Sequence, residues 1–274
     1  MQKTRLAIAA IAAAAALALS GCGGGTSGGG SADKIKIGIK FDQPGLGYKD
    51  GDKYTGFDVA VATYVANELG FPADKIEFVS TPSATRETAL QNKQVDMIFA
   101  TYSITDARKQ SVAFAGPYFI AGQDLLVRQD NNDIKGPEDL NGKTLCSVTG
   151  STSAKKIKDN YATTVNLQEL PGYAECVTAM EGGQIDAVTT DDIILAGLAA
   201  QPAYQGKFKV VGAPFSEEKY GVGLNKESDK CKSINDAIAK MISSGEWQKA
   251  LDTNTAGTGY KPSAANPPKQ DACA

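Results

Sequence analysis

The sequence predicts an α/β fold that consists of two similar lobes. Short apolar strands alternate with amphipathic helices along most of the chain, an order typical of α/β proteins. Residues 95–100 are apolar apart from Asp96, like a strand buried in a parallel sheet. Residues 90–98 and 180–188 also match: each contains Gln-[Val/Ile]-Asp between the end of a helix and an apolar strand. Two lobes leave a cleft between them, which is a usual place for a ligand site.

The predicted elements follow the periodicity of the apolar residues. In the first half, strands are expected at 35–40, 76–79 and 95–100, and helices at 57–69 and 83–91. In the second half, strands are expected at 125–127, 143–148 and 185–190, and helices at 151–161 and 173–181. A strand at 220–224 and helices at 233–242 and 245–251 follow, and the last segment, 257–274, is expected to be irregular and held by Cys273.

The first residues have the pattern of an export signal. Two basic residues precede an uncharged apolar run, Leu6–Leu19, which is shorter than the ~20 residues that cross a bilayer. The sequence Leu19-Ser-Gly-Cys22 resembles the bacterial lipobox, so we expect a signal peptide over 1–21 and a lipid on Cys22. The alternative is ordinary cleavage with Cys22 as a free thiol. Residues 22–32 are rich in Gly and Ser and are expected to be a flexible tether on the outer face of the cytoplasmic membrane.

Composition narrows the function classes. Loss of residues 1–21 removes two positive charges and changes the formal net charge from −3 to −5. No basic stripe is present, so a nucleic-acid partner is not expected. The chain has no histidine, which removes the commonest metal ligand and general base. We expect a monomer without metal or cofactor.

Four further cysteines, in an exported chain, favour disulfides. They are Cys146, Cys176, Cys231 and Cys273, and four cysteines permit three pairings that the sequence does not decide. We favour Cys146–Cys176 and Cys231–Cys273, because these are the nearer partners along the chain.

Polar clusters follow several predicted strands, at the ends where open α/β sheets bind ligands. In the first cluster the hydroxyls of Thr101 and Ser103 leave a buried strand together, and Arg108 follows. A guanidinium binds a carboxylate in bidentate geometry, and hydroxyl donors complete the contact. The alternative is a plain helix start, with Thr105 as N-cap and Arg108 in solvent.

The second cluster, Thr149–Ser153, stands between a strand and a helix, where free N–H groups favour an anion. The alternative is a plain N-cap by Ser151 or Thr152. In the third cluster Asp191 follows a buried strand, where it either receives an ammonium group or caps the next helix.

The fourth cluster contains two cations, Lys40 and the arginine of Ser83-x-x-Arg86. The sequence assigns no obvious acidic partner to either of them. The alternative is that both are solvated surface charges.

The first cluster is part of a longer pattern. Ser103-Ile-Thr-Asp-Ala-Arg108 followed by Phe114-Ala-Gly-Pro-Tyr118 resembles the Ser/Thr-x-Thr-x-x-Arg…Phe-Ser-x-Pro-Tyr pattern of polar amino-acid-binding proteins of ABC importers, the bacterial extracellular solute-binding proteins of family 3. Other matches occur in the family's order: Gly56-Phe-Asp58, Gly150-Ser-Thr152, Gln184-Ile-Asp186 and Tyr220-Gly-Val-Gly223. The likeness covers about 35–251, and Phe41–Gly47 resembles the glutamate-binding lipoproteins of actinobacteria.

The resemblance implies a periplasmic-binding-protein fold, in which two α/β lobes joined by two hinge strands close over the ligand. It implies that residues 33–121 and 215–274 form lobe 1 and that residues 122–214 form lobe 2. It also implies ABC permease subunits as partners.

The resemblance further implies a role for each polar cluster. Arg108 would hold the α-carboxylate of the amino acid, with help from Ser103, Ser151 and Thr152. Asp191 would bind the α-ammonium group, and Thr101 would add a donor or acceptor. Lys40 and the pair Ser83 and Arg86 match positions that aspartate/glutamate binders use for the distal carboxylate.

Three departures from the family pattern concern the pocket wall. Lysine replaces arginine at Lys40, so contact there is a point charge. The usual Pro-Phe pair is absent, which leaves Phe41 or Tyr48 as candidates for an aromatic wall. Tyr173 falls near a histidine of some acidic-amino-acid binders, and we include it in the candidate wall.

The leading hypothesis is therefore a glutamate-binding protein, with aspartate as the second acidic candidate. Glutamine or asparagine is the nearest rival, with Arg86 bonded to the amide oxygen. A dehydratase of the same fold is disfavoured by the missing histidine and nucleophile elbow. A ligand sensor that signals to a membrane kinase has the same sequence features and remains an alternative.

Overall fold

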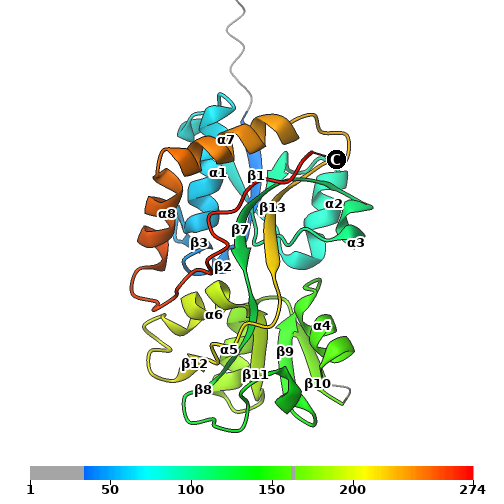
Figure 1. The fold of residues 1–274 in the computed structure, drawn as a ribbon, viewed down its shortest axis with the longest axis vertical. Coiled ribbons are helices and arrows are strands. Elements are labelled where there is room, and N and C mark those ends of the chain that lie inside the picture. The colour runs from blue at the N-terminus through cyan, green and yellow to red at the C-terminus, as the bar shows by residue number, and fades with distance from the viewer. Residues whose placement is uncertain (1–33, 162–163, 274) are drawn as a thin grey trace, which may run out of the picture. The chain divides into compact units, whose positions relative to one another are not determined.

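Two separate five-stranded sheets, each flanked by helices, organise the computed structural model of this chain (Figure 1). The structure describes residues 34–161 and 164–273, which lie within the compact unit Asp33–Ala274. Because each sheet with its helices forms one α/β lobe, the prediction of an α/β fold with two lobes is confirmed. The predicted signal peptide, Cys22 and the tether lie outside the described residues.

The lobe that contains the first strand, called lobe 1, has the strands β1 (Ile35–Ile39), β5 (Ile76–Ser80), β6 (Met97–Ile98), β7 (Ala113–Ala121) and β13 (Glu218–Leu224). Its helices are α1 (Phe57–Glu68), α2 (Arg86–Gln91), α3 (Asp106–Lys109), α7 (Cys231–Ser243) and α8 (Glu246–Thr255), with 3-10 turns at Ala73–Lys75 and Ser83–Thr85. The strand order is β5-β1-β6-β13-β7. β1 is parallel to β5 and β6, whereas β13 is antiparallel to β6 and β7.

The other lobe, lobe 2, has the strands β8 (Gln123–Arg128), β9 (Thr144–Val148), β10 (Asn166–Leu170), β11 (Ala187–Asp191) and β12 (Phe208–Val210). Its helices are α4 (Ser153–Asn160), α5 (Tyr173–Glu181) and α6 (Asp192–Ala199), with a 3-10 turn at Pro137–Leu140. The strand order is β10-β9-β11-β8-β12, with β9 parallel to β10 and β11 and with β8 antiparallel to its two neighbours.

The sequence repeat has a structural counterpart in the two sheets. Each copy leads into a central strand, β6 in lobe 1 and β11 in lobe 2. The aspartate of each copy accepts a backbone N–H from the neighbouring parallel strand: Asp96 from Lys36 at 2.8 Å and Asp186 from Thr144 at 2.8 Å. In each lobe, the aspartate of the repeated Gln-[Val/Ile]-Asp therefore joins the start of the central strand to its parallel neighbour.

The chain passes between the lobes twice, at Gly122 between β7 and β8 and again between β12 and β13. A small sheet of β2 (Asp42–Gln43), β3 (Gly47–Asp50) and β4 (Lys53–Thr55) follows β1. Its residue Asp42 accepts the backbone N–H of Tyr173 in lobe 2 at 3.2 Å. This sheet therefore touches both lobes.

The observed elements differ from the predicted ones in several places. The sequence analysis did not predict β7, β10, β12, α6 or the small sheet β2-β3-β4. The predicted strand 95–100 is reduced to Met97–Ile98, because the chain turns at Thr101, whose φ is 46°. The predicted helix 83–91 begins with a 3-10 turn and becomes α-helical at Arg86.

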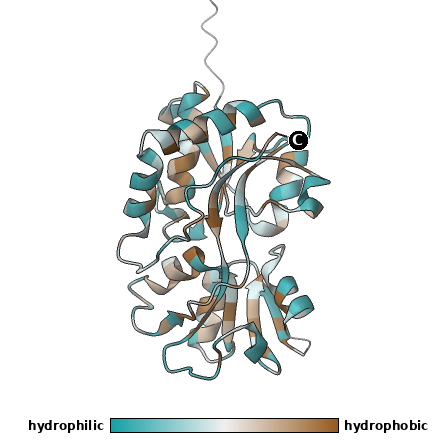
Figure 2. Ribbon diagram, in the orientation of Figure 1, coloured by the Kyte–Doolittle hydropathy of each residue, from teal (hydrophilic) through white to brown (hydrophobic). Residues whose placement is uncertain are grey.

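Apolar side chains fill the interior of both lobes. Figure 2 shows hydrophobic residues along the strands and the inward sides of the helices, and hydrophilic residues on the outer parts of the helices. In lobe 1 the rings of Phe57 and Phe119 lie 5.5 Å apart, and Trp247 packs edge-on against Phe57 at 5.5 Å. Among the described residues, no helix is long and apolar enough to cross a membrane.

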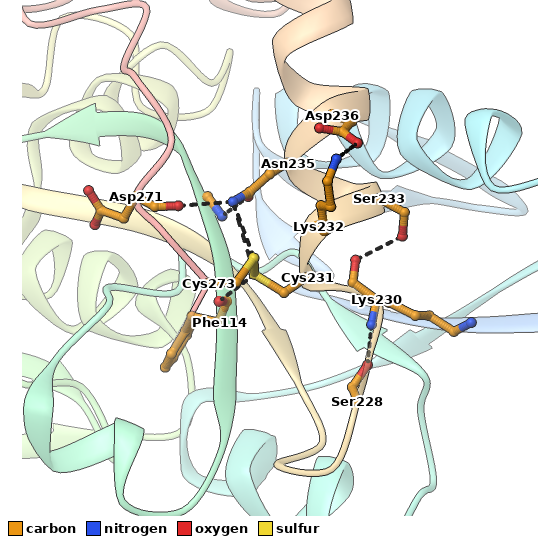
Figure 3. Close-up of a disulfide and its surroundings, with 11 residues drawn as sticks. Phe114, Ser228, Lys230, Cys231, Lys232, Ser233, Asn235, Asp236, Asp271 and Cys273 are labelled. Carbon is orange, nitrogen blue, oxygen red and sulfur yellow. Dashed lines mark hydrogen bonds and ion pairs between the residues drawn. A yellow bond between two sulfur atoms is a disulfide. The ribbon is translucent and has the colours of Figure 1, made fainter.

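Two disulfides join the pairs favoured from the sequence. Cys146 of β9 is bonded to Cys176 of α5, which fixes two neighbouring elements of lobe 2. Cys273 is bonded to Cys231 at the start of α7 (Figure 3). The sequence analysis expected Cys273 to hold the final segment, and the structure agrees.

The C-terminal segment 257–273 runs beside β7, the last strand of the sheet in lobe 1. The side chain of Asn266 accepts from the N–H of Ile120 at 2.9 Å and donates to its carbonyl at 2.7 Å. Asp271 donates its N–H to Gly116 at 2.7 Å, and Asn235 donates to the carbonyl of Asp271 at 2.9 Å (Figure 3). The outer backbone groups of Ile120 and the carbonyl of Gly116 in β7 are thus bonded to this segment.

Candidate ligand-binding site

A small polar cavity of about 20 Å³ lies where the two lobes meet. A volume of this size holds about one water molecule, so an amino acid enters only when the lobes are further apart. Lobe 1 contributes Ser83, Arg86, Thr101, Ser103 and Arg108 to its lining, and lobe 2 contributes Ser151, Thr152, Ser153, Tyr173, Thr190, Asp191 and Ile194.

The lobe 1 wall depends on the turn at Thr101. A positive φ is unfavourable for a β-branched residue, and a buried carboxylate holds this one in place. Asp58, fully buried in the first turn of α1, accepts the N–H of Thr101 at 2.9 Å and the hydroxyl of Tyr118 at 2.8 Å. Burial raises the pKa of Asp58 to about 6, and both hydrogen bonds oppose this rise. The turn directs the side chains of Thr101 and Ser103 to the cavity.

Arg108 is held by both lobes. Thr105 caps α3 by accepting the N–H of Arg108 at 3.2 Å, as the alternative reading of this motif expected. The guanidinium is nevertheless buried rather than solvated: it donates to the carbonyls of Ser103 at 2.8 Å and of Gly150 at 3.3 Å. Its Nε lies 3.3 Å from a carboxylate oxygen of Glu87.

Of the two arginines that line the cavity, Arg86 has fewer hydrogen-bond partners. Only 3 % of its surface is exposed, and Nη1 donates to the carbonyl of Ala100 at 2.9 Å. Nε is buried without a hydrogen-bond partner, and no carboxylate in 34–161 or 164–273 forms an ion pair with this guanidinium. Burial, followed by the nearby Arg108, lowers the pKa of Arg86 to about 10. A buried cation in this condition is stabilised by an anion that enters the cavity.

The lobe 2 wall begins at the N-terminus of α4. Ser151 accepts the N–H of Ser153 at 3.1 Å, while Thr152 occupies the N-cap position without a side-chain capping bond. Gly150 precedes them with φ 81°, and a Cβ at this position would lie 2.7 Å from backbone atoms of Ala84 in lobe 1. Only glycine therefore permits this close approach of the lobes.

Asp191 ends β11 and faces the cavity. Its carboxylate accepts the hydroxyl of Tyr220 at 2.6 Å and makes no capping bond to α6, so the capping alternative is wrong for this side chain. Burial, and then the nearby Glu218, raise the pKa of Asp191 to about 8. An ammonium group placed here would favour the ionised carboxylate.

Three candidates from the sequence do not line this cavity. Lys40 is buried behind Ser83, to which its Nζ donates at 3.3 Å, and it lines a neighbouring cavity together with Phe41. Phe41 packs against Tyr54, with the ring centroids 5.3 Å apart. Tyr48 lies on β3 opposite Asp42. Phe41 and Tyr48 therefore do not line this cavity in the structure, because Phe41 directly precedes the small sheet and Tyr48 lies on its strand β3.

Tyr173 is the aromatic residue of the candidate wall that does reach the cavity. Its hydroxyl donates to Ser151 at 3.2 Å. The ring also lies 5.8 Å from the Nζ of Lys40.

The sequence analysis did not assign a role to several residues of the site. Ser153 and Thr190 belong to the second and third polar clusters, and Ile194 lies one helical turn after Asp191, so spacing was a usable signal for all three. Asp58 supports Thr101, and Tyr220 supports Asp191. Both residues stand in segments that match the family pattern, but these two roles depend on contacts between distant segments.

A larger cavity beside α6 and β12 contains none of these residues. Its carboxylates are already engaged: Asp124 accepts the N–H of Gly212 at 2.9 Å, and Asp192 accepts that of Ile193 at 2.7 Å. In the described part of the chain, no group of His, Cys, Asp and Glu side chains could hold a metal ion. The polar cavity between the lobes is the stronger candidate site.

Two α/β lobes with open sheets, two connections between them and a buried polar cavity at their junction are the architecture of two-lobed solute-binding proteins. The chain matches the model of "Bacterial extracellular solute-binding proteins, family 3" over residues 35–255, and it belongs to this family. Members of the family are extracellular solute-binding proteins.

Named relatives agree with this assignment. The chain is 47% identical over 232 residues to the glutamate-binding protein GluB of Corynebacterium glutamicum, covering 80% of this chain and 78% of that protein. It is 38% identical over 221 residues to the ABC transporter glutamine-binding protein GlnH of Bacillus subtilis, covering 79% of each. An ancestral arginine-binding protein solved with arginine superposes with a TM-score of 0.74 at 31% identity, covering 81% of this chain and 97% of that structure.

Proposed function

We propose that this chain captures L-glutamate between its lobes and delivers it to the permease of an ABC importer, with L-aspartate as a second, weaker ligand. The observation that carries the proposal is Arg86, a buried guanidinium with no anionic partner among the described residues. The name of the relative GluB supports the same ligand.

Charge balance favours an acidic amino acid over a neutral or basic one. The charged side chains that line the cavity are Arg86, Arg108 and Asp191, which together carry one excess positive charge once the ammonium group of the ligand has ionised Asp191. Glutamate carries one excess negative charge, glutamine none, and arginine one positive charge. Since unpaired buried charges are costly, the ligand that neutralises the cavity is preferred.

Each ligand group has a matching partner. Arg108 binds the α-carboxylate, with donors from Ser103 and from the start of α4 at Ser151 and Thr152. Asp191 binds the α-ammonium group.

The distal carboxylate needs donors of its own. Arg86 and Ser83 bind it, and Thr101 adds a hydrogen bond. Lys40 acts through its bond to Ser83, because it does not line the cavity itself.

We also propose that the N-terminal residues anchor the protein to a membrane. Signal cleavage after residue 21 and lipidation of Cys22 would tether a monomer to the outer face of the cytoplasmic membrane. We also propose that residues 33–121 and 215–274 form lobe 1 and that residues 122–214 form lobe 2. Replacement of Cys22 by serine should release the protein in soluble form, and unchanged membrane partition would refute the anchor.

Glutamine is the second candidate ligand, because the relative GlnH binds it and Arg86 can donate to an amide oxygen. Calorimetric titration of the purified protein with every standard amino acid tests the proposal. We expect glutamate to bind most tightly, and tighter binding of glutamine would overturn the assignment. A parallel turnover assay with cyclic dienoates tests the dehydratase alternative, for which we expect no product.

A further inference from the structure

Tyr102 lies between two cavity residues, Thr101 and Ser103, but its own side chain does not line the cavity. The residue is fully buried on the other side of this segment. Its ring centroid lies 4.2 Å from the Cζ of Arg86 and 5.0 Å from the Cζ of Arg108. One aromatic ring therefore contacts both guanidinium groups of the site, although these come from the different helices α2 and α3.

The ring is held firmly from the sides that the arginines do not occupy. Phe114 of β7 packs against it edge-on, with the centroids 4.8 Å apart. A Cβ on Gly223 would lie 2.6 Å from a ring carbon, so the backbone of β13 is pressed against the ring. Glu87 adds a second constraint through its contact with the Nε of Arg108.

This arrangement has an electrostatic consequence. Two like charges in a small buried volume repel each other, and the electron-rich face of an aromatic ring offsets part of that repulsion. Without the ring, each arginine would be free to turn toward other acceptors. With it, the two guanidinium groups keep a fixed separation.

Apart from the bond between Arg108 and the carbonyl of Gly150, all these contacts lie within lobe 1. The ring therefore acts on both guanidinium groups before lobe 2 closes over the ligand, and such preorganisation raises affinity for a ligand of matching length. Glutamate and aspartate differ by one methylene group, a difference that a rigid site distinguishes by about 10- to 200-fold.

We infer that Tyr102 is a positioning residue that fixes Arg86 relative to Arg108 and thereby sets the spacing between the two ligand carboxylates, which favours glutamate over aspartate. The inference rests on the proposed function and adds the origin of chain-length selectivity to it.

Titration of glutamate and aspartate into Tyr102→Phe, Tyr102→Leu and the control Phe78→Leu tests the inference. Tyr102→Phe keeps the ring, and its selectivity should stay within about twofold of the unmodified protein. Tyr102→Leu should bind glutamate about tenfold or more weakly, and its glutamate-to-aspartate ratio should fall by about fivefold or more. Phe78 of β5 packs against the ring of Tyr54 instead, so Phe78→Leu removes an aromatic contact elsewhere in lobe 1 and the ratio should not change. An unchanged ratio in Tyr102→Leu would overturn the inference.

A second measurement separates this inference from the proposed function. The Nε–H signals of Arg86 and Arg108 in nitrogen-15 NMR spectra, assigned with Arg→Lys variants, should both move in Tyr102→Leu and stay in place in Phe78→Leu. If the unmodified protein binds neither acid, the proposed function fails, yet these signals still decide the role of Tyr102. If Tyr102→Leu does not fold, Tyr102→Met keeps more of the volume, and the same outcomes apply to it.

Discussion

Arg86 and Arg108 carry the same charge but have different surroundings. Arg108 already contacts two carbonyl groups and Glu87, whereas Arg86 has one carbonyl and a buried Nε without a partner. Removing the charge of Arg86 should therefore affect mainly the distal carboxylate of the ligand, which is the anionic partner that this guanidinium lacks.

Replacement of Arg86 by glutamine should weaken glutamate by about 30-fold or more, because a buried carboxylate then lacks its countercharge. Glutamine should lose only a few-fold, since an amide needs hydrogen bonds alone. Lys40→Gln should have a smaller effect in the same direction, because it acts through Ser83. Calorimetry with both ligands checks this, with the exposed Lys93→Gln as control. Equal losses for both ligands would refute the role of Arg86 while leaving the family assignment intact.

Ligand binding should release a proton from Asp191. Burial and the nearby Glu218 raise its pKa to about 8, so without an ammonium group beside it the carboxyl group is largely protonated at pH 7. The α-ammonium group lowers this pKa, so the complex holds fewer protons, and affinity rises with pH up to about 8. Calorimetry at pH 7 in buffers of different ionisation enthalpy detects the released proton. The same heat in every buffer would contradict the prediction, and Asp191→Asn should show no buffer dependence.

The residues of the site could be predicted in part. Ser103, Arg108, Thr152 and Asp191 follow strand ends, which marked them as candidates, and the resemblance to the family supplied their roles. Phe41 and Tyr48 lie outside the cavity lining for a geometric reason: Phe41 precedes, and Tyr48 belongs to, a small sheet of short polar strands whose periodicity is too brief to read. Their distance from the cavity depends on where this sheet packs.

At the scale of elements, long periodic segments were predictable and short ones were not. α1 and α7 have apolar faces that repeat over several turns, and both lie close to their expected limits. The nine-residue strand β7 was missed because it contains Gly116 and Pro117, residues that normally interrupt strands. Strand β12 has only three residues, so its pairing with β8 decides its conformation.

The loop between β9 and α4 gives a prediction at this scale. Gly150→Ala should weaken every amino-acid ligand by about tenfold or more, because a Cβ there would strike Ala84 of the opposite lobe on closure. Gly142→Ala is a matched control: φ is 76°, but no atom lies within 4 Å of the added Cβ. Both variants should lose about 1 kcal/mol of stability from the left-handed backbone. Thermal unfolding and titration separate the two effects. Equal binding losses would show that strain alone is responsible.

At the scale of the whole molecule, several contacts join the lobes without involving the ligand. Arg108 reaches the carbonyl of Gly150, Asp42 accepts the N–H of Tyr173, and the hydroxyl of Tyr220 bonds to Asp191. Such contacts stabilise the closed state, so they add to affinity for any ligand that favours closure.

Asp42→Ala should therefore weaken glutamate and glutamine by a similar factor, about tenfold, since a charge-assisted hydrogen bond between the lobes is lost. The loss should appear as faster dissociation, because the contact exists only after closure. Stopped-flow measurements with both ligands check this, and Asp50→Ala, an exposed position on the same small sheet, is the control. A loss confined to one ligand would mean that Asp42 acts on selectivity instead.

The C-terminal segment has a consequence for the behaviour of many copies together. An unpaired edge strand is a template for pairing with another chain, and β7 would be such an edge in lobe 1. The bonds from Asn266 and Asp271 occupy outer backbone groups of Gly116 and Ile120, and the bond between Cys231 and Cys273 ties the segment to α7. This cover blocks part of the edge of the lobe 1 sheet, so the last residues of the chain hinder pairing with a strand of another molecule.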